Sequence, residues 1–259
     1  ISSKNLKNFK YFKRNNENLS TNFSKLKAAD VIIICLPTPL KKLKPDMSYI
    51  INCAKKLAAI NLKNKAIILE STVYPSATFE FFKIINRKNI YIPGKNMFLG
   101  YSPERENPGD KNFSYKKTPK IISGYTPSCL KVMENIYSHI IKKLVKAKNI
   151  ESAEASKLLE NLYRAVNIGL VNEFKIICDK LKLDIFEIIN LASTKNFGFQ
   201  KFLPGPGLGG HCIPIDPYYL SWISNKFGYD PKFIKLSGEL NRSMPQWVVK
   251  KMLKNIDKK

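Results

Sequence analysis

The chain has 259 residues, of which 44% are hydrophobic, and it carries a formal net charge of +24. Its length and apolar content are sufficient for a substantial core divided between more than one domain, since about 150 residues per domain is a common size. The longest aliphatic run, residues 31–36, is far shorter than the roughly 20 residues that span a membrane, and no signal segment opens the chain, so we expect no membrane partner.

The strong positive charge invites a nucleic-acid interpretation, because cations that neutralise phosphates give such binders their affinity. Most of the basic residues are lysines, however, and they occur in scattered pairs such as Lys41-Lys42 and Lys142-Lys143. This distribution favours a solvated surface, so we expect no nucleic-acid partner. A modest attraction for anionic, phosphate-bearing substrates is still compatible with the charge.

The five cysteines are odd in number and form no C-x-x-C pair, which indicates a reducing, cytoplasmic location. Cys35, Cys53 and Cys178 stand in apolar surroundings typical of inert core packing. Only Cys212 lies in a glycine-rich stretch among polar groups.

The first half of the chain alternates short apolar runs with helical stretches, which predicts a parallel α/β sheet. The predicted strands cover residues 31–36, 66–69, 97–101 and 120–123, and the predicted helices cover 46–59 and 76–86. The first three strands each end in a polar loop marked by proline, namely "CLPTPL", "ESTVYP" and "YSPERENPGD". Ligands bind at the carboxyl ends of parallel strands, so three such loops favour a ligand site over simple turns.

The second half of the chain is predicted to be helical. Residues 152–180 lack proline and predict one helix about 40 Å long. Five polar residues fall within about 80° on that helix, either as an ordinary solvated face or as polar groups that a buried helix presents inward. They are Lys157, Asn161, Arg164, Asn172 and Lys175. Further helices are predicted at 184–192, 217–227 and 246–256.

The spacing of Gly205, Gly207 and Gly210 matches G-x-G-x-x-G, but no strand precedes it and prolines interrupt it. We therefore interpret it as a glycine-rich loop carrying Cys212, and not as a dinucleotide fingerprint. Asp216 is a predicted N-cap of the following helix, and a helix N-terminus can lower the pKa of a nearby thiol and make it a better nucleophile.

Five separated segments together resemble the UDP-glucose/GDP-mannose dehydrogenase family, the nucleotide-sugar 6-dehydrogenases. They are "CLPTPL", "YSPERENPGD", "SAEASKLLENLYRAVNIGLVNE", "PGPGLGGHCIPIDPYYLSW" and "GELNRSMPQWVV". Ile215 stands where the UDP-glucose branch usually has lysine, so the resemblance favours the branch that acts on UDP-N-acetylglucosamine or UDP-N-acetylmannosamine. It implies a partial Rossmann-like domain over residues 1–148, without the family's N-terminal fingerprint. Residues 149–259 would form the central helical and dimerisation domain, and the C-terminal UDP-binding domain would follow.

The family's reaction, as the resemblance implies it, is an NAD-dependent, two-step oxidation of a sugar C6 hydroxyl to a carboxylate for surface polysaccharide precursors. Cys212 is assigned as the nucleophile that forms a thiohemiacetal and then a thioester. Lys157 and Asn161 resemble the pair that stabilises the developing oxyanion. Glu104 matches the residue that activates water, and Thr72 and Asp216 match groups that orient water and the acid–base network.

The resemblance also implies contacts to cofactor and substrate. The cofactor NAD would meet Pro37, Thr38, Glu70, Ser71 and Thr72. The UDP-sugar would meet Glu104, Arg105, Lys157, Asn161, Arg164, Phe202, Gly207, Gly209, His211 and Arg242. No metal site is expected, because His139 and His211 are the only histidines and no ligand cluster accompanies them.

Two other functions remain open at this point: a UDP-glucose or GDP-mannose 6-dehydrogenase, and a non-catalytic nucleotide-sugar-binding fragment. The resemblance further implies a homodimer formed through the long helix. Ser76 replaces a glycine that is common in the family, a departure that bears on the local backbone geometry. Without the fingerprint, we expect this chain alone to bind NAD poorly.

Overall fold

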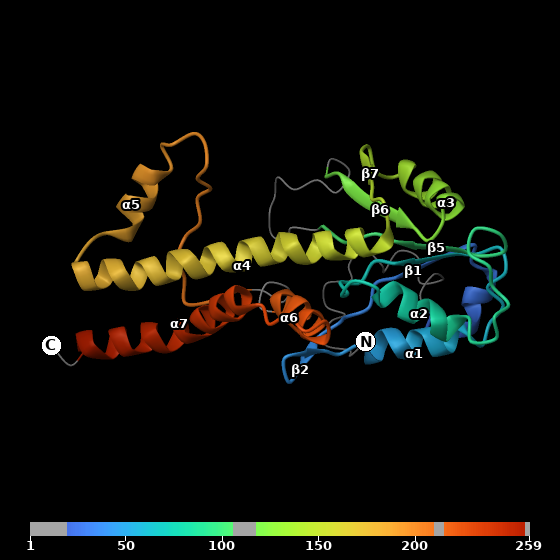
Figure 1. Cartoon of the computed structure of the whole chain (residues 1–259), viewed down its shortest axis with the longest axis horizontal. Coiled ribbons are helices and arrows are strands. Elements are labelled where there is room, and N and C mark those ends of the chain that lie inside the picture. Colours follow the sequence, from blue (N-terminus) through green and yellow to red (C-terminus); the bar gives the residue numbers. More distant parts are fainter. Residues whose placement is uncertain (1–19, 106–117, 210–214, 257–259) are drawn as a thin grey trace.

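The computed structural model describes residues 20–105, 118–209 and 215–256. It consists of a sheet covered by helices on both faces and a helical part built along one long helix, α4 (Figure 1). Helix α4 passes from the sheet into the helical part, so it belongs to both. The division expected near residue 148 falls just before α4 begins at Ile150, and it stays a prediction.

The main sheet has five strands in the order β1-β4-β5-β6-β7. Strands β1, β4 and β5 are parallel, β6 is antiparallel to β5, and β7 is parallel to β6. The bounds are β1 Val31–Ile34, β4 Ala66–Leu69, β5 Phe98–Tyr101, β6 Lys120–Gly124 and β7 Leu144–Lys146. A separate two-stranded hairpin pairs β2 Leu40–Lys41 with β3 Lys44–Pro45.

The expectation of a parallel sheet is confirmed for the first three strands and is wrong for β6. A parallel neighbour needs a crossover connection, usually a helix, whereas an antiparallel neighbour does not. The proline-rich sequence between β5 and β6 has no helical periodicity. Because β6 runs in reverse, its first residue, Lys120, lies at the edge where β1, β4 and β5 end.

Alternate residues of each central strand pack on opposite faces of the sheet. Ile67 of β4 belongs to the larger core with Leu57 and Phe81, whereas the next residue, Ile68, packs with Met133. The larger core lies under α1 Ser48–Leu57 and α2 Ala77–Ile85, and the smaller core lies under α3 Pro127–Ser138. A short 3-10 helix, η3 Phe23–Ala28, packs at the β1 side of the sheet.

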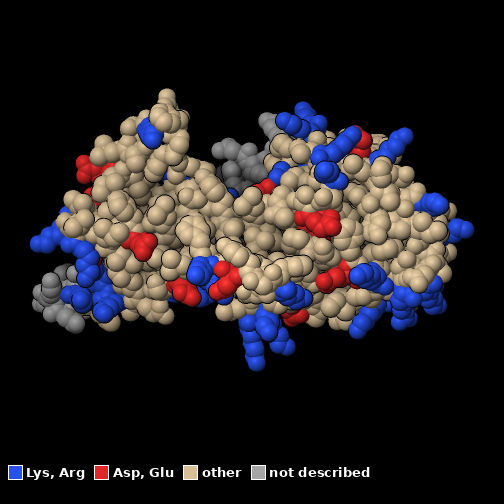
Figure 2. All heavy atoms as spheres, viewed as in Figure 1, with Lys and Arg blue, Asp and Glu red and all other residues tan. Residues whose placement is uncertain are grey.

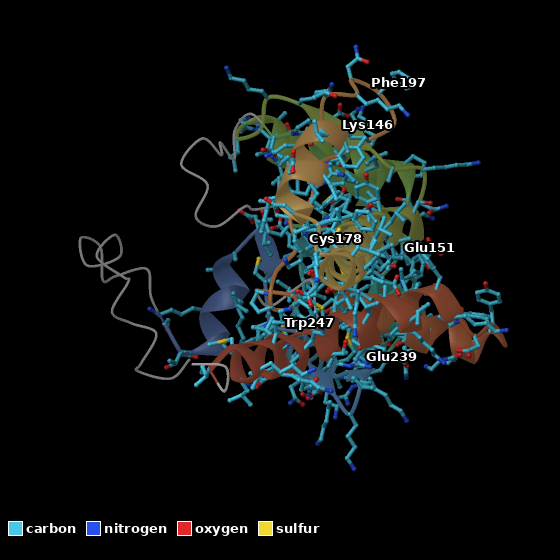
Figure 3. All side chains as sticks on the ribbon, turned by 90° about the vertical axis from the view of Figure 1, so that its left-hand side faces the viewer. Lys146, Glu151, Cys178, Phe197, Glu239 and Trp247 are labelled. Carbon is cyan, nitrogen blue, oxygen red and sulfur yellow. The ribbon has the colours of Figure 1, made fainter. Side chains whose placement is uncertain are left out.

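The helical part contains α4 Ile150–Leu181, α5 Ile185–Ala192, α6 Asp216–Lys226 and α7 Lys232–Ile256. The side chain of Asn149 caps α4 by accepting a hydrogen bond from the Ser152 N–H at 2.7 Å. Viewed along its axis, α4 lies at the centre of the molecule with α7 beneath it (Figure 3). The expected bounds of α4 are confirmed to within two residues at each end.

Helix α7 is much longer than the expected 246–256 and continues through Pro245. A proline inside a helix removes one hydrogen bond and usually ends or kinks the helix. Here the turns before Pro245 bury Ser237, Asn241 and Met244, so packing outweighs the local cost. Tertiary burial, which sequence periodicity does not reveal, extends the helix.

The surface is basic but carries its charges in several groups. On the face shown in Figure 2, lysine and arginine side chains cluster at both ends and along the lower edge, and acidic side chains lie between them. Within the described residues, none of the helices combines the length and the apolar character needed to cross a bilayer.

A buried carboxylate joins α4 to the sheet domain. Glu154 is fully buried, and its two oxygens accept hydrogen bonds from the N–H of Ser76 at 2.6 Å, the N–H of Thr78 at 2.9 Å and the hydroxyl of Thr78 at 2.6 Å. These donors lie at the start of α2, where unpaired N–H groups favour an anion. Ser76, which stands where the family commonly has glycine, has a φ of 75°, in the left-handed region that favours glycine.

Burial raises the pKa of Glu154 to about 7. The three hydrogen bonds act in the opposite direction, but burial is the larger effect. The unfolded chain, with an ordinary pKa near 4.5, therefore loses this proton at lower pH than the folded chain does. The contribution of Glu154 to the free energy of unfolding must fall as pH rises from about 4.5 to about 7.

We predict that Glu154→Gln lowers stability most at pH 5 and less at pH 8, since Gln stays neutral throughout. The difference in unfolding free energy between the wild type and the variant should shrink by up to about 3 kcal/mol across this window. Urea unfolding of both proteins from pH 5 to pH 8 measures it. Glu173→Gln, on an exposed position of the same helix, is the control and should show no such trend. A difference that stays constant with pH would contradict the assignment.

Candidate active site

An ion-pair network closes the edge where β1, β4 and β5 end. Lys120 Nζ lies 3.2 Å from Glu70 Oε1 and 3.8 Å from Glu104 Oε2, with Lys120 and Glu70 both buried. The Tyr137 hydroxyl donates to Glu70, and the Lys120 ammonium lies 5.1 Å from the centre of the Tyr137 ring. Glu70 therefore serves as the counter-ion of Lys120, and Lys120 in turn attracts Glu104, which is only half-buried.

The other residues expected at the cofactor are tied to one another across the ends of β1 and β4. Thr38 Oγ1 donates to the carbonyl of Thr72 at 2.7 Å, and the Thr38 carbonyl accepts from the Tyr219 hydroxyl. Ser71 Oγ accepts from the Leu36 N–H at 2.8 Å. These contacts fix the two loops side by side. The side chain of Thr72 is half-buried, and Pro37 is exposed.

Helix α4 crosses next to this edge and gathers expected site residues on one side. Asn161 Nδ2 donates to Asp216 Oδ2, which joins α4 to the first residue of α6. Arg105, which follows Glu104, forms an ion pair with Glu160 and donates to the Pro119 carbonyl at 3.1 Å. Arg105 is thus engaged by the protein itself, and it holds the Glu104 loop against α4.

Lys157 lies between these contacts on the surface of α4. At 100° per residue, its direction falls between that of Glu160, which meets Arg105, and that of Asn161, which meets Asp216. Its side chain is half-buried and makes no hydrogen bond or ion pair with any residue that the structure describes. The Lys157 ammonium group, which has no partner among the described residues, therefore lies between the sheet edge and α6.

Asp216 was expected to be the N-cap of α6, and this expectation is wrong by one residue. The N-cap is Ile215, without a side-chain cap, and Asp216 begins the helix as a buried residue. Its carboxylate accepts a hydrogen bond from Asn161 of α4. The side chain that was expected to cap α6 therefore makes a tertiary contact.

Tyr101, at the end of β5, is fully buried, and its hydroxyl has no hydrogen-bond partner within the described ranges. Burial first, then the nearby carboxylates of Glu154 and Asp216, raise the pKa of Tyr101 well above its ordinary value. The hydroxyl stays protonated, so Tyr101 is an available donor between the sheet and α4.

Cys35, at the end of β1, is the described cysteine next to this edge. Its sulfur lies 3.8 Å from Glu70 Oε2. Cys35 is exposed, so the expectation of core packing is wrong for this residue. Partial burial of its sulfur, followed by the negative charge of Glu70, raises the pKa of Cys35 to about 11, so at neutral pH it is a thiol and a poor nucleophile. Burial likewise raises the pKa of Cys53.

The glycine-rich loop is described as far as Gly209. The Phe202 ring packs edge-on against Tyr163 of α4, with centroids 6.0 Å apart. Gly207 has a φ of 126°, which side chains rarely tolerate, and Gly209 has open space around it. The expected nucleophile Cys212 and its neighbour His211 lie outside the described residues. Arg164 is exposed on α4.

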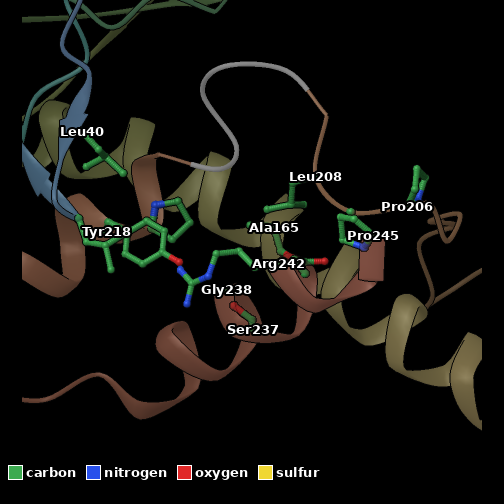
Figure 4. A pocket seen from close by; sticks show the side chains of 13 residues that line it. Leu40, Ala165, Pro206, Leu208, Tyr218, Ser237, Gly238, Arg242 and Pro245 are labelled. Carbon is green, nitrogen blue, oxygen red and sulfur yellow. The ribbon is translucent and has the colours of Figure 1, made fainter. Parts of the chain in front are cut away.

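A pocket of about 350 Å³ lies beneath the loop, between the β2–β3 hairpin, α6 and α7 (Figure 4). Gly207 and Arg242, two of the expected substrate contacts, line it. The Arg242 guanidinium lies 5.3 Å from the centre of the Tyr218 ring. The structure thus places these two expected contacts at the pocket, and it places Glu104, Arg105 and Asn161 near Lys157.

Sequence reasoning missed several residues that organise the site. Lys120 gave no signal, because it is one of many lysines, and Glu154 stands in an alanine-rich helical pattern without a motif of its own. Asn172 was noticed on the polar arc, but no role was assigned to it. The missed residues are Lys120, Tyr137, Glu154, Asn172, Tyr219 and Asn241.

Comparisons with known proteins identify the family of this chain. The NAD binding domain of the UDP-glucose/GDP-mannose dehydrogenase family matches residues 3–141, and the family's central domain matches residues 151–243. The protein CapL of Staphylococcus aureus is 38% identical over 94% of this chain and 58% of its own length. A UDP-N-acetyl-D-glucosamine 6-dehydrogenase of Pseudomonas aeruginosa is 36% identical over 90% of this chain and 56% of its own length.

Solved structures give the same result. A UDP-D-ManNAc dehydrogenase from Pyrococcus horikoshii superposes with a TM-score of 0.86 at 29% identity, covering 92% of this chain and 56% of that one. Cap5O, a UDP-N-acetyl-mannosamine dehydrogenase from S. aureus, superposes with a TM-score of 0.77 at 31% identity, covering 90% and 55%. The chain spans somewhat more than half the length of the relatives that it matches. With both domain matches and this shared fold, the chain belongs to the UDP-glucose/GDP-mannose dehydrogenase family.

Proposed function

We propose that the protein containing this chain oxidises the C6 hydroxyl of a UDP-N-acetylhexosamine, N-acetylglucosamine or N-acetylmannosamine, to a carboxylate, with NAD as hydride acceptor. The product would serve as a precursor of surface polysaccharide. The observation that carries the proposal is the convergence of Lys157, Asn161 and Asp216 on one side of α4, beside the Glu104 loop. Relatives whose printed names give a substrate, a UDP-N-acetyl-D-glucosamine 6-dehydrogenase and UDP-N-acetyl-D-mannosamine dehydrogenases, support the choice within the family.

Lys157 and the Asn161–Asp216 pair would stabilise charge on the sugar oxygen. Oxidising an aldehyde requires a tetrahedral adduct whose oxygen becomes negative, and a cation together with an amide donor lowers its energy. Lys157 is the cation, and its lack of partners within the described residues leaves it available. Asp216 orients Asn161 by accepting one of its two amide hydrogens, which leaves the other for substrate.

Cys212 would provide the covalent step. In sequence it stands three residues after Gly209 of the glycine-rich loop and four before Asp216, which contacts Asn161. Its thiolate adds to the C6 aldehyde, and loss of hydride converts the adduct to a thioester, which water then cleaves. Glu104 would activate that water. Lys120 Nζ, 3.8 Å from Glu104 Oε2, would hold that carboxylate at the edge of the sheet.

NAD would supply hydride acceptance in both oxidations. The described residues fit one side of this cofactor: Thr72 and Pro37 stand at the carboxyl ends of adjacent parallel strands, where ligands of such sheets bind. None of the described turns carries G-x-G-x-x-G between a strand and a helix. Beside them, edge strand β1 exposes Val31 and Ile33, and a hollow of about 450 Å³ lies against it.

We predict that this chain alone binds NAD weakly, without saturation below millimolar concentration, because no turn among the described residues carries the phosphate-binding fingerprint and no described strand pairs with the outer edge of β1. Isothermal titration of the purified 259-residue chain with NAD measures this. Tight, saturable binding would contradict the proposed division of the cofactor site.

We predict that Cys212→Ala abolishes formation of the carboxylate in the complete protein, reducing kcat by at least about 10³-fold, since no thioester can form. Coupled NADH formation with UDP-N-acetylglucosamine and UDP-N-acetylmannosamine measures it, and UDP-glucose and GDP-mannose are tested in parallel. Cys53→Ala is the matched control and should retain activity within about twofold. Unchanged turnover in Cys212→Ala would point to non-catalytic nucleotide-sugar binding, and faster turnover of UDP-glucose or GDP-mannose would overturn the substrate assignment.

A homodimer through α4 is the assembly that we propose. Six exposed apolar side chains of α4 fall within about 60° around the helix axis and form one stripe along it, here called the α4 stripe. They are Leu159, Tyr163, Leu170, Phe174, Ile177 and Leu181. A continuous apolar stripe on an amphipathic helix is typical of a helix that packs against another surface.

We predict that Leu170→Asp converts the dimer to a monomer, because it would bury a charge at the centre of the α4 stripe. Light scattering coupled to gel filtration measures the mass. Ile140→Asp, on a similarly exposed residue outside α4, is the control and should remain dimeric. A wild type that is monomeric at micromolar concentration would rule out this assembly.

A further inference from the structure

Two buried amides connect α4, α7 and the glycine-rich loop. Asn172 is 0% exposed and Asn241 is 2% exposed. Asn172 Nδ2 donates to Asn241 Oδ1 at 2.9 Å, and Asn241 Nδ2 donates to the Ala165 carbonyl at 2.9 Å. At the other end, Asn172 Oδ1 accepts from the Gly205 N–H at 2.8 Å. The four groups form a single chain of hydrogen bonds that begins on the loop and ends on the backbone of α4.

The direction of this chain is fixed by its ends. Gly205 offers a backbone N–H, which can only donate, and Ala165 offers a carbonyl, which can only accept. Rotating either amide by 180° would place donor against donor or acceptor against acceptor, so one orientation of each side chain satisfies all groups. The pair therefore specifies where the loop backbone must lie, beyond filling space in the core.

At Gly207, two residues after Gly205, the loop also fits closely against the backbone of Asn241. Gly207 has a φ of 126°, and a Cβ added there would lie 3.2 Å from the Asn241 carbonyl oxygen. Gly205 is bonded to one amide and Gly207 packs on the backbone of the other, so the loop is held at two points.

The same side of α4 carries the proposed oxyanion groups. Asn172 follows Asn161 by 11 residues, which places it about 20° around the axis and about 16 Å along it. One rigid helix thus presents Lys157 and Asn161 to the substrate and, three turns later, Asn172 to the loop. Neither Asn172 nor Asn241 has a role in the mechanism above.

We propose that Asn172 and Asn241 are positioning residues that fix the glycine-rich loop at Gly205 and Gly207, on the segment that leads in sequence to Cys212. The inference rests on the proposed function, because it assigns Cys212 a reaction for which the loop must be placed. Detaching the loop would leave the groups present but misaligned, and misplacement by about 1 Å can cost on the order of 10²-fold in rate.

The first measurement needs no catalysis. Hydrogen exchange of the complete wild-type protein should show the Gly205 amide protected, and Asn172→Ala should remove that protection. Asn167→Ala is the matched control, because Asn167 lies on the same helix and donates only to the Tyr163 carbonyl within α4. Rapid exchange of Gly205 in the wild type would overturn the inference, whatever the protein catalyses.

The second measurement is kinetic. Asn172→Ala and Asn241→Ala should each lower kcat by about 10- to 100-fold, leave the KM for NAD within about twofold, and combine without additivity, since both break one chain. Gly205→Pro, which removes the loop N–H and leaves the core amides intact, should lower kcat more than Gly205→Ala, whose added Cβ meets only ordinary contacts.

The outcomes separate the two proposals. A purely structural role predicts lower thermal stability with unchanged kcat well below the unfolding temperature, and that result would overturn the positioning role. If Asn172→Ala fails to fold, the comparison of Gly205→Pro with Gly205→Ala tests the positioning role. Equal kcat in those two variants would reject that role. A wild type inactive on every nucleotide-sugar tested would defeat the proposed function, while exchange at Gly205 would still show whether the amides hold the loop.

Discussion

The arrangement of the site depends on a buried carboxylate between two parts of the molecule. Glu154, a residue of α4, accepts three hydrogen bonds from groups at the N-terminus of α2. These bonds leave little freedom for α4 to slide or turn against the sheet. One turn later on α4 comes Lys157, followed by Glu160 and Asn161. A shift at Glu154 would therefore displace every group that α4 brings to the edge of the sheet.

The polar residues around the edge are of two kinds: those whose side chains have hydrogen-bond or ion-pair partners within the fold, and those whose side chains have none among the described residues. Glu70, Lys120, Thr38 and Ser71 bond to partners within the fold and so build the walls. Lys157 has no such partner among the described residues, and the Tyr101 hydroxyl is buried without one. An enzyme needs groups of both kinds, because reactive side chains are placed accurately only when the residues around them are already bonded.

The sequence was most informative where local pattern and global structure agree. Proline-marked loops after apolar runs located the edge of the sheet, and a run without proline located α4, because both signals follow from backbone geometry. It was least informative where tertiary contacts override local rules. Pro245 lies inside α7, Asp216 bonds to α4 in place of capping its own helix, and β6 reverses direction. Lys120 and Glu154 could not have been singled out, since their importance arises only from partners distant in the chain. The predicted roles of Cys212 and His211 remain predictions.

The reversed strand has a consequence for how durable the site is. In a wholly parallel sheet, the residues at the ligand edge come from the carboxyl ends of the strands and from the connecting segments that follow them. Lys120 is instead the first rung of a ladder, since its neighbour in β7 is Leu144 and its backbone follows the pleat of β6. Strand pairing therefore fixes the backbone of this cation beside Glu70, 3.2 Å from Nζ to Oε1, without support from the adjoining connections.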